Sequence, residues 1–457
     1  MAGLLVAVDF GSTFTKAIAV DSGSGDLVAR AEHRTTIDTD VMDGWHACRN
    51  ALLDVDRGVD RAEVLACSSA GGGLRIGVVG NEELVTAEAG RRVALSSGGR
   101  VVAVVNGGLT ATSLKELRKD RPDVVLLLGG TDGGNAAVLR NAAEVLARYK
   151  WRRPVVVAGN IDARAGIGET LAAAGVPHVL ADNVVPEIGV FAPDSARAAI
   201  REMFLAHVIG GKNLSRDPAF ARMVRAATPD VVLRGVEVLA GLHGDVAVVD
   251  IGGATTDVHS VIELDPEDAN LGREVVATHP VTRTVEGDLG MRWSAVPVVA
   301  AGVESGLIPD DDLLSTAAAR RHADPSYLPD SEREASYDEL LARVAATVAL
   351  RRHAGRQRIV FGPGGRVIER SGKDLREVDL LVGSGGVLRH NGPDIAARIL
   401  GSVGVNAQEE GWLVPERAEV CVDKDYVLAG VGLLADRAPA AAEGLAAHIH
   451  GTVRTGH

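Results

Sequence analysis

The sequence contains few cysteines, few aromatic residues and no long apolar run. Its 457 residues include only Cys48, Cys67 and Cys421, which are too far apart for a disulfide framework, a CxxC metal site or an iron–sulfur site. Aromatic residues make up 3% of the chain and hydrophobic residues 46%, so the core must be built from Val, Leu, Ile and Ala. Such a core is typical of parallel sheets covered by helices.

The chain also lacks the features of membrane, secreted and nucleic-acid-binding proteins. No apolar stretch is long enough to cross a bilayer, and the amino-terminal apolar run lacks a basic leader and ends at Asp9. The 61 acidic and 48 basic residues give a net charge of −13, which argues against a broad surface for nucleic acid. We therefore expect a cytoplasmic protein that binds any anion in a local pocket.

The order of apolar runs predicts an α/β fold that begins with one lobe. Runs at 4–9 and 16–21 predict a β-hairpin, and a strand at 27–33, a helix at 41–53 and a strand at 64–67 follow. From residue 100 strands and helices alternate, which predicts right-handed crossovers and a parallel sheet inserted into this lobe. The expected strands are 101–105, 124–128, 155–158 and 177–181, and the expected helices are 110–119, 135–148 and 163–174.

A second lobe follows. A helix at 230–242 leads into a strand at 246–250, and the later landmarks are a helix at 337–353, a hairpin around 361–366 and a strand at 378–382. After Arg437 an Ala-rich helix ends in a polar tail. The expected domains are residues 1–99 (first lobe), 100–205 (inserted domain), 206–244 (return to the first lobe), 245–420 (second lobe) and 421–457 (connecting helix and tail).

Two glycine-rich turns share one design. In VAVDFGSTFTKAIAVD, residues 6–21, Asp9 closes a strand, Gly11, Ser12 and Thr13 form the turn, and Lys16 lies on the next strand. Backbone amides in such a turn can surround phosphate oxygens, and a carboxylate at the strand end can hold hydrated magnesium. An ordinary polar hairpin would give the same local pattern.

The same turn design occurs a second time in VAVVDIGGATTDVHSV, at 246–261. This repetition argues against a chance origin of the first pattern. The second copy contains Asp250, Gly252, Gly253, Thr255 and Asp257 in the same order. Two copies separated by about half the chain predict one phosphate-binding hairpin in each lobe.

A third turn, VDLLVGSGGVLRH at 378–390, follows a buried strand and precedes a helical stretch. Gly383, Ser384, Gly385 and Gly386 allow close approach of the backbone to a ligand. Because Leu388 stands where a dinucleotide fingerprint needs glycine, the turn does not belong to that class.

The three turns, in this order, resemble those of the superfamily of actin, the DnaK chaperones and sugar kinases. The resemblance implies a two-lobed actin-like ATPase fold in which Asp9 and Asp250 hold Mg²⁺ and Asp257, with Asp250, serves hydrolysis by orienting water. The residues implied in nucleotide binding are Gly11, Ser12, Thr13, Lys16, Gly252, Gly253, Thr255, Gly383, Ser384, Gly385 and Gly386. It also implies connecting elements at 285–292 and 425–436. The chain departs from relatives at Thr13, Ala254 and Val387.

Further stretches resemble a narrower family, the accessory proteins of glutamate mutase called GlmL or MutL. The match covers essentially the whole chain. Its motifs are CSSAGGGLR (67–75), LVTAEAGRRVAL (84–95), PDVVLLLGGTDGGN (122–135), VVVAGN (155–160), NVVPEIG (183–189) and RTVEGDLGMR (283–292). The resemblance implies an ATP-dependent reactivating factor, or chaperone, whose partners are subunits of an adenosylcobalamin-dependent aminomutase.

The loops after the inserted strands suggest a second site. They lie at the carboxyl edge of the expected sheet, where open α/β sheets hold ligands, so Asp132, Asn135, Asn160, Asn183 and Glu187 could converge there. Tight strand-to-helix turns also favour Gly and Asn for structural reasons alone.

The leading hypothesis is a helper protein with weak Mg-dependent ATPase activity, and an oligomer is compatible with it. Phosphoryl transfer to water needs positioning and charge neutralisation, which the two Asp-bearing turns and Lys16 can supply. The alternatives are a small-molecule kinase, an ATP-dependent hydantoinase-type amide hydrolase, and a filament or scaffold subunit that binds ATP structurally.

Overall fold

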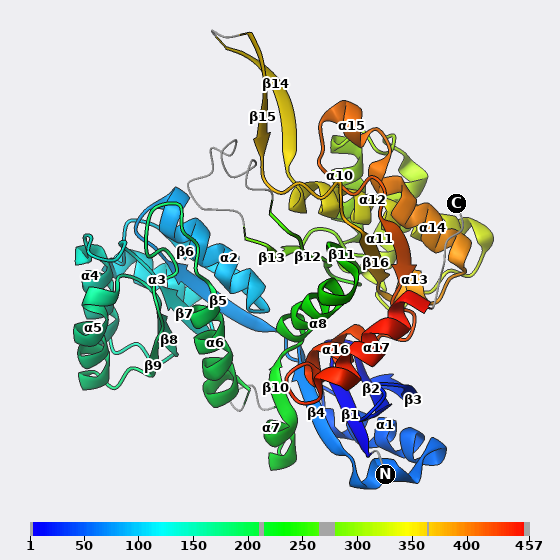
Figure 1. Ribbon diagram of the computed structural model, residues 1–457, viewed down its shortest axis with the longest axis horizontal. Helices are drawn as coiled ribbons and strands as arrows, with labels where there is room; N and C mark the ends of the chain where they lie inside the picture. The colour runs from blue at the N-terminus through cyan, green and yellow to red at the C-terminus, as the bar shows by residue number, and fades with distance from the viewer. Residues whose placement is uncertain (1–2, 210–213, 265–278, 363–364, 452–457) are drawn as a thin grey trace. The chain divides into compact units, whose positions relative to one another are not determined.

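The computed structural model describes residues 3–209, 214–264, 279–362 and 365–451. They form two compact units (Figure 1). The first consists mainly of residues up to 234 together with 429–442, and the second mainly of residues 235–264, 280–428 and 443–451. The chain passes between the units within α8 (Thr228–His243), at 279/280, at the start of α16 (Leu428–Leu434) and within α17 (Pro439–Gly451).

The first sheet of the first unit has the strand order β10-β4-β1-β2-β3. Strands β1, β2 and β3 form an antiparallel meander, β4 pairs with β1 in parallel, and β10 pairs with β4 in parallel. Helix α1 (Val41–Val55) packs against β2 and β3 and begins after Asp40, whose carboxylate accepts the Met42 N–H at 2.9 Å. The strands are β1 (Leu4–Phe10), β2 (Phe14–Asp21), β3 (Leu27–Arg34), β4 (Glu63–Ser68) and β10 (Val224–Ala227).

The inserted sheet, also in the first unit, is wholly parallel and has the order β6-β5-β7-β8-β9. Its strands are β5 (Leu74–Val79), β6 (Gly99–Val105), β7 (Val124–Leu127), β8 (Val155–Val157) and β9 (His178–Leu180). The four expected strands are confirmed, and β5 is an additional strand between β6 and β7.

Helices cover both faces of this sheet (Figure 1). On one face α3 (Ala111–Lys119), α4 (Ala137–Arg148) and α5 (Ile161–Ala173) enclose a core that includes Leu127. On the other, α2 (Glu88–Ser96) and α6 (Asp194–Met203) contribute to a core that contains Val78 and Val156 and continues to Val6 and Phe10 of the first sheet. The insertion therefore shares a core with the first sheet.

The sheet of the second unit repeats the arrangement of the first, with the order β13-β12-β11-β16-β17. Three strands form an antiparallel meander, and β16 and β17 extend it in parallel. The strands are β11 (Val246–Ile251), β12 (Thr256–Val261), β13 (Val281–Glu286), β16 (Leu380–Ser384) and β17 (Glu419–Val422).

Helix α12 (Glu332–His353) forms the centre of the second core, where every residue from Val344 to Arg351 is buried. Helices α10 (Ala295–Glu304), α11 (Asp312–Ala323) and α14 (Pro393–Gly401) pack against it. The ribbon of β14 (Arg356–Gly362) and β15 (Gly365–Ser371) matches the expected hairpin, whose turn at 363–364 lies outside the described residues. The terminal helix α17 spans Pro439–Gly451, and the expected tail, 452–457, is also outside them.

The α/β class with parallel sheets is confirmed, and the repeated strand order agrees with the actin-like architecture expected from the motifs. The first connecting element was expected at 285–292; these residues lie in the second unit, shortly after a boundary between the units at 279/280, and the element stays a prediction. Helix α12 begins at Glu332 rather than 337 because Ser331 caps it, its hydroxyl accepting the Glu334 N–H at 3.4 Å. The domain boundaries stay predictions.

Candidate functional site

The first glycine-rich turn joins β1 and β2 in the predicted position. The Gly11 N–H donates to the Phe14 carbonyl at 3.1 Å, and a Cβ on Gly11 would lie 2.5 Å from that oxygen, so the turn closes only with glycine there. Ser12 and Thr13 are exposed at the tip. In the β1–β2 register Asp9 pairs with Lys16. This hairpin therefore presents a short polar tip beside a carboxylate and an ammonium group.

The second turn, between β11 and β12, has the same construction. The Gly252 N–H donates to the Thr255 carbonyl at 2.9 Å, and Asp250 pairs with Asp257 in the strand register. Asp250 thus corresponds to Asp9, whereas Asp257 occupies the position that Lys16 has in the first hairpin.

The tip of the second hairpin is bound on one side by the segment 290–294. The Met291 and Arg292 N–H groups donate to the carbonyls of Gly252 and Gly253 at 2.9 and 2.8 Å, and the Ser294 hydroxyl donates to the Ala254 carbonyl at 2.7 Å. A Cβ on Gly290 would lie 2.4 Å from the Ala254 carbonyl carbon. Residues 285–292, expected as a connecting element, thus end in a support for the second glycine-rich turn.

This support fixes the direction of the peptide N–H groups. In a trans peptide the carbonyl and the following N–H point in opposite directions, and none of the described peptide bonds is cis. Since the carbonyls of residues 252–254 face the supporting segment, the N–H groups of Gly253, Ala254 and Thr255 point away from it. Successive N–H groups that point to one side form a concavity suited to an anion.

Asp9 is buried at the end of β1 and bound by two donors from distant parts of the chain. The Thr228 hydroxyl donates to its carboxylate at 2.6 Å, and the Cys67 thiol donates to the same oxygen at 3.5 Å. Burial, together with the charge of Asp9, raises the pKa of Cys67 well above its ordinary value, so this thiol keeps its proton. Asp9 is therefore held in one orientation.

Asp257 is also held by its neighbours. Arg283 lies on β13, where it pairs with His259 of β12. Its Nη2 donates to one carboxylate oxygen of Asp257 at 2.8 Å, and the Thr255 hydroxyl donates to the other oxygen at 3.2 Å. The Arg283 side chain is 5% exposed and that of Asp257 20%. The Asp257 carboxylate is therefore bound by a buried cation and is still partly exposed to solvent.

The third turn follows β16 and lies beside the second hairpin. Strand β16 pairs with β11 so that Ser384 is opposite Asp250. Gly385 has φ +102°, and a Cβ there would lie 2.2 Å from the Ile251 carbonyl oxygen. Helix α13 (Gly386–Arg389) begins directly after it. The structure thus brings together the second and third predicted turns, both in the second unit, while the first turn belongs to the first unit.

The loops at the carboxyl edge of the inserted sheet also come together, as predicted. Asn183 Nδ2 donates to the Asp132 carboxylate at 2.8 Å, and the Ile161 N–H donates to the same oxygen at 3.0 Å. Asn160, which is 1% exposed, donates to the Thr131 and Gly134 carbonyls at 2.7 and 3.0 Å. These three side chains therefore fasten the loops to one another.

The other two residues of this set contribute differently. The Asn135 side chain accepts the Ala137 N–H at 2.8 Å at the start of α4, and Glu187 is exposed on the loop after β9. A ligand site at this edge stays a prediction, as do the roles of all the site residues named above.

Comparison with known proteins decides the family. Residues 5–449 match the model of the family described as MutL protein. The chain belongs to the MutL protein family. This MutL family member is 36% identical over 445 residues to Protein MutL of Clostridium tetanomorphum, with 94% of this chain and 96% of that protein covered. The family resemblance predicted from the sequence motifs is therefore confirmed.

Solved structures resemble this MutL family member only distantly. Nucleotide-free acetone carboxylase is 17% identical, with a TM-score of 0.41 and coverage of 95% of this chain and 70% of that one. The ROK hexokinase of Thermus thermophilus is 11% identical, with a TM-score of 0.28 and coverage of 98% of both chains.

The described residues of this MutL family member contain neither a membrane-spanning helix nor a metal-binding cluster of side chains. Within them, no helix has both the length and the apolar character needed to span a membrane. The same residues contain no cluster of three or more His, Cys, Asp and Glu side chains arranged to hold a metal ion.

Sequence reasoning missed two residues of this MutL family member that position the site. Thr228 binds Asp9, and Asp423, 1% exposed after β17, accepts the Val427 and Leu428 N–H groups at 2.8 and 3.1 Å where α16 begins. The Asp423 N–H donates to the Gly383 carbonyl at 2.9 Å, which links the third turn to α16. An acidic residue four positions before the apolar run that starts at Val427 was the available signal for Asp423.

Proposed function

We propose that this protein binds Mg·ATP, hydrolyses it slowly and acts as an accessory, reactivating factor for an adenosylcobalamin-dependent aminomutase such as glutamate mutase. The observation that carries the nucleotide part is the tip of the second hairpin. There the N–H groups of Gly253, Ala254 and Thr255 point to one side, between strands that carry Asp250 and Asp257. This geometry suits a phosphate group.

The residues present fit magnesium as well as phosphate. Asp9 and Asp250 stand at equivalent strand ends, and a carboxylate in this position is a ligand that Mg²⁺ prefers. When bound, the ion would neutralise phosphate charge. Ser12, Thr13 and Lys16 would contact phosphate from the first hairpin, and the turn at 383–386 would approach the adenosine. Asp257, which is partly exposed to solvent, would orient the attacking water.

Family membership supports the proposed partner role, and the inserted domain is the part we assign to recognition. Its carboxyl-edge loops present exposed apolar side chains, with Ile188 80% exposed, Val190 43% and Ile161 40%. Exposed apolar groups gathered on fastened loops suit contact with another protein. The proposed place of action is the cytoplasm, where the protein would meet the mutase subunits.

Thermal and chemical unfolding with and without Mg·ATP or Mg·ADP tests the nucleotide part. A ligand at about a hundred times its dissociation constant adds roughly 2.7 kcal/mol to the free energy of unfolding. We expect such an increase for the wild type and for Asp310→Asn, a change in an exposed loop, and a smaller one for Asp250→Asn. If folded, nucleotide-free protein gains no stability from millimolar Mg·ATP, the proposal is wrong.

A further inference from the structure

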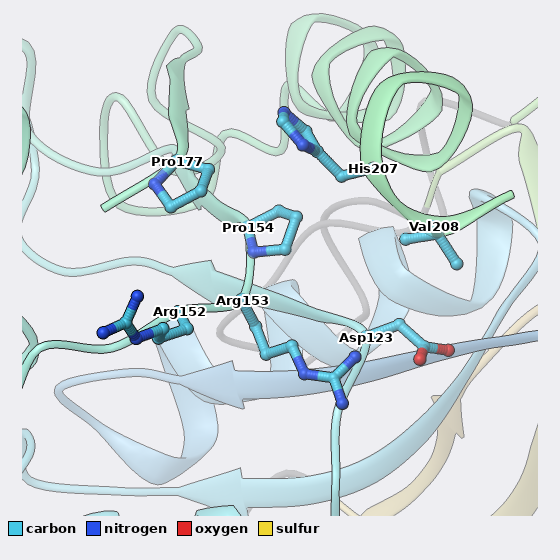
Figure 2. Close-up of a pocket in the computed structure, with 7 residues that line it drawn as sticks. All are labelled: Asp123, Arg152, Arg153, Pro154, Pro177, His207 and Val208. Atoms are coloured by element: carbon cyan, nitrogen blue, oxygen red, sulfur yellow. The ribbon is translucent and has the colours of Figure 1, made fainter. Parts of the chain in front are cut away.

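A hollow of about 320 Å³ lies in the inserted domain, apart from the three glycine-rich turns (Figure 2). It is at the amino edge of the parallel sheet, because Asp123, Pro154 and Pro177 immediately precede β7, β8 and β9. The helical turn η3 (Phe204–Val208), which follows α6, contributes His207 and Val208. Its volume lies within the range of about 300–1,000 Å³ found for small-molecule pockets.

The backbone of Pro154 and Pro177 offers a ligand no N–H group at this edge. The carbonyls of these two residues accept the N–H groups of Val125 and Val155, both at 2.9 Å. Together with Val208 the two prolines form rigid, apolar walls. The polar contacts of a ligand must therefore come from side chains.

Those side chains carry charges of both signs. Figure 2 shows Arg153 extending to the side on which Asp123 lies, the His207 ring on η3, and Arg152 extending in the opposite direction from the chain. Asp123 is fixed at the start of β7, since its carboxylate accepts the Arg75 N–H at 3.0 Å and its own N–H donates to the Arg75 carbonyl at 2.7 Å. In a chain of net charge −13, the Arg153 guanidinium is a local positive charge to which a small anion is drawn.

We propose that this hollow binds a small molecule through an oxyanion, phosphate or carboxylate, held by Arg153 and His207. Arginine suits such groups because its guanidinium donates two parallel hydrogen bonds. The fixed carboxylate of Asp123 disfavours a densely charged anion and favours a ligand that also carries an ammonium or hydroxyl group. The ligand class is therefore a small amphoteric molecule, and the site is independent of nucleotide binding.

Calorimetric titration of the full chain tests this proposal with three probes. Phosphoethanolamine and γ-aminobutyrate each carry an ammonium group and differ in the oxyanion, whereas inorganic phosphate lacks the ammonium group. We expect one of the first two to bind more tightly than phosphate, which identifies the oxyanion. Arg153→Ser should weaken that binding about tenfold or more, because a hydrogen bond to a charged group is lost. Asp123→Asn should remove the preference over phosphate.

Arg148→Ser is the matched control, since it removes the same charge from an exposed residue at the end of α4 that does not line the hollow. Its affinity should stay within about twofold of the wild type, because exposed charges at a distance are screened. Equal loss in the two variants would mean general attraction by positive charge, and absence of binding by any probe at millimolar concentration would equally overturn the site. Melting curves and Mg·ADP binding, both expected unchanged, keep this result separate from the nucleotide proposal.

Discussion

Asp257 binds a buried arginine and is also partly exposed, so different substitutions at this residue should have different effects. One carboxylate oxygen is bound by the buried guanidinium of Arg283, and the side chain is still 20% exposed. Asp257→Asn keeps an acceptor for Arg283 and removes only the negative charge. Asp257→Ala removes the carboxylate that binds a buried cation, a change that typically costs about 3 kcal/mol or more.

We expect Asp257→Asn to slow ATP hydrolysis about a hundredfold while the dissociation constant of Mg·ATP changes little, since the residue would orient water. Asp257→Ala should lose the same activity and also unfold at lower denaturant. Asp9→Asn should instead weaken nucleotide binding in magnesium and matter less without it. Turnover assays and calorimetry separate these effects, and an equal loss of binding in the Asp257 and Asp9 variants would contradict the division of roles.

His353, the last residue of α12, is buried in the second unit. Its Nε2 lies 2.8 Å from the Ser260 hydroxyl and 3.1 Å from Lys373 Nζ, and its Nδ1 lies 2.9 Å from the Thr284 hydroxyl. It therefore joins α12 to β12 and β13, the strands that carry Asp257 and its arginine partner. Burial, the charge of Lys373 and the proximity of His259 lower the pKa of His353 well below its ordinary value.

The same holds for His259, whose pKa is lowered by burial and by Arg283. Both rings stay neutral in the folded state, whereas in the unfolded state both gain a proton below about pH 6.5. The unfolded state then binds more protons, so the free energy of unfolding should fall as the pH drops from about 6.5 to 5. Denaturant titrations should give a smaller fall for His353→Gln than for the wild type, and identical pH slopes would refute this account.

At the residue level, prediction of position succeeded where a residue's neighbours are close in the sequence. The spacing of Asp250 and Asp257 around one turn indicated that both lie at its base, and the strand register confirms this. Thr228 and Arg283 were not predicted because their contacts with Asp9 and Asp257 join residues 219 and 26 positions apart. Such pairings depend on the packing of whole elements and leave no local pattern.

At the scale of elements, the third turn depends on one backbone conformation. Gly385 has φ +102°, a region that side chains rarely adopt, and its Cα lies against the Ile251 carbonyl at the base of the second hairpin. Gly385→Ala should therefore strain the backbone and separate β16 from β11 at this end, with a loss of about 1–3 kcal/mol or more in unfolding free energy.

Gly386→Ala is a suitable comparison, because the nearest atom to a Cβ there is 4.0 Å away. It should unfold within about 0.5 kcal/mol of the wild type, as surface changes usually do. Equal stability of the two variants in chemical denaturation would show that the close approach at Gly385 is unimportant.

Strands with uninterrupted apolar runs were predicted, whereas two strands whose runs are interrupted by arginine or glycine were not. Strand β10 has only four residues, including an arginine, and β5 is followed closely by polar turns, so neither gave a clear run. Both strands are recognised only from the strands with which they pair. Strand β10 pairs with β4, and β5 pairs with β6 and β7. Parallel strands that pair across long sequence distances carry little local information about their sheet.

At the scale of the whole molecule, partner recognition is assigned to the inserted domain. The polar residues of its carboxyl-edge loops are poor targets for mutation, because Asp132, Asn160 and Asn183 hold the loops together. Ile188 is better suited, since it is 80% exposed. We expect Ile188→Glu to reduce or abolish ATP-dependent rescue of an inactivated aminomutase while basal ATP hydrolysis and melting stay unchanged.

Leu328→Glu makes the same change at a residue 74% exposed in the second unit and should leave rescue intact. Mutase activity measured over time after addition of each variant provides the comparison. If Ile188→Glu rescues as well as Leu328→Glu, this edge of the insertion does not contact the partner.

The repeated strand order gives each position of the first hairpin a counterpart in the second. Asp9 and Asp250, Gly11 and Gly252, and the buried Thr15 and Thr256 are the same residue types at matched positions. Lys16 and Asp257 also occupy matched positions but carry opposite charges. The two hairpins are therefore equivalent in backbone and opposite in electrostatic character at this one strand position, so the molecule is symmetric in its chain path and asymmetric in its chemistry.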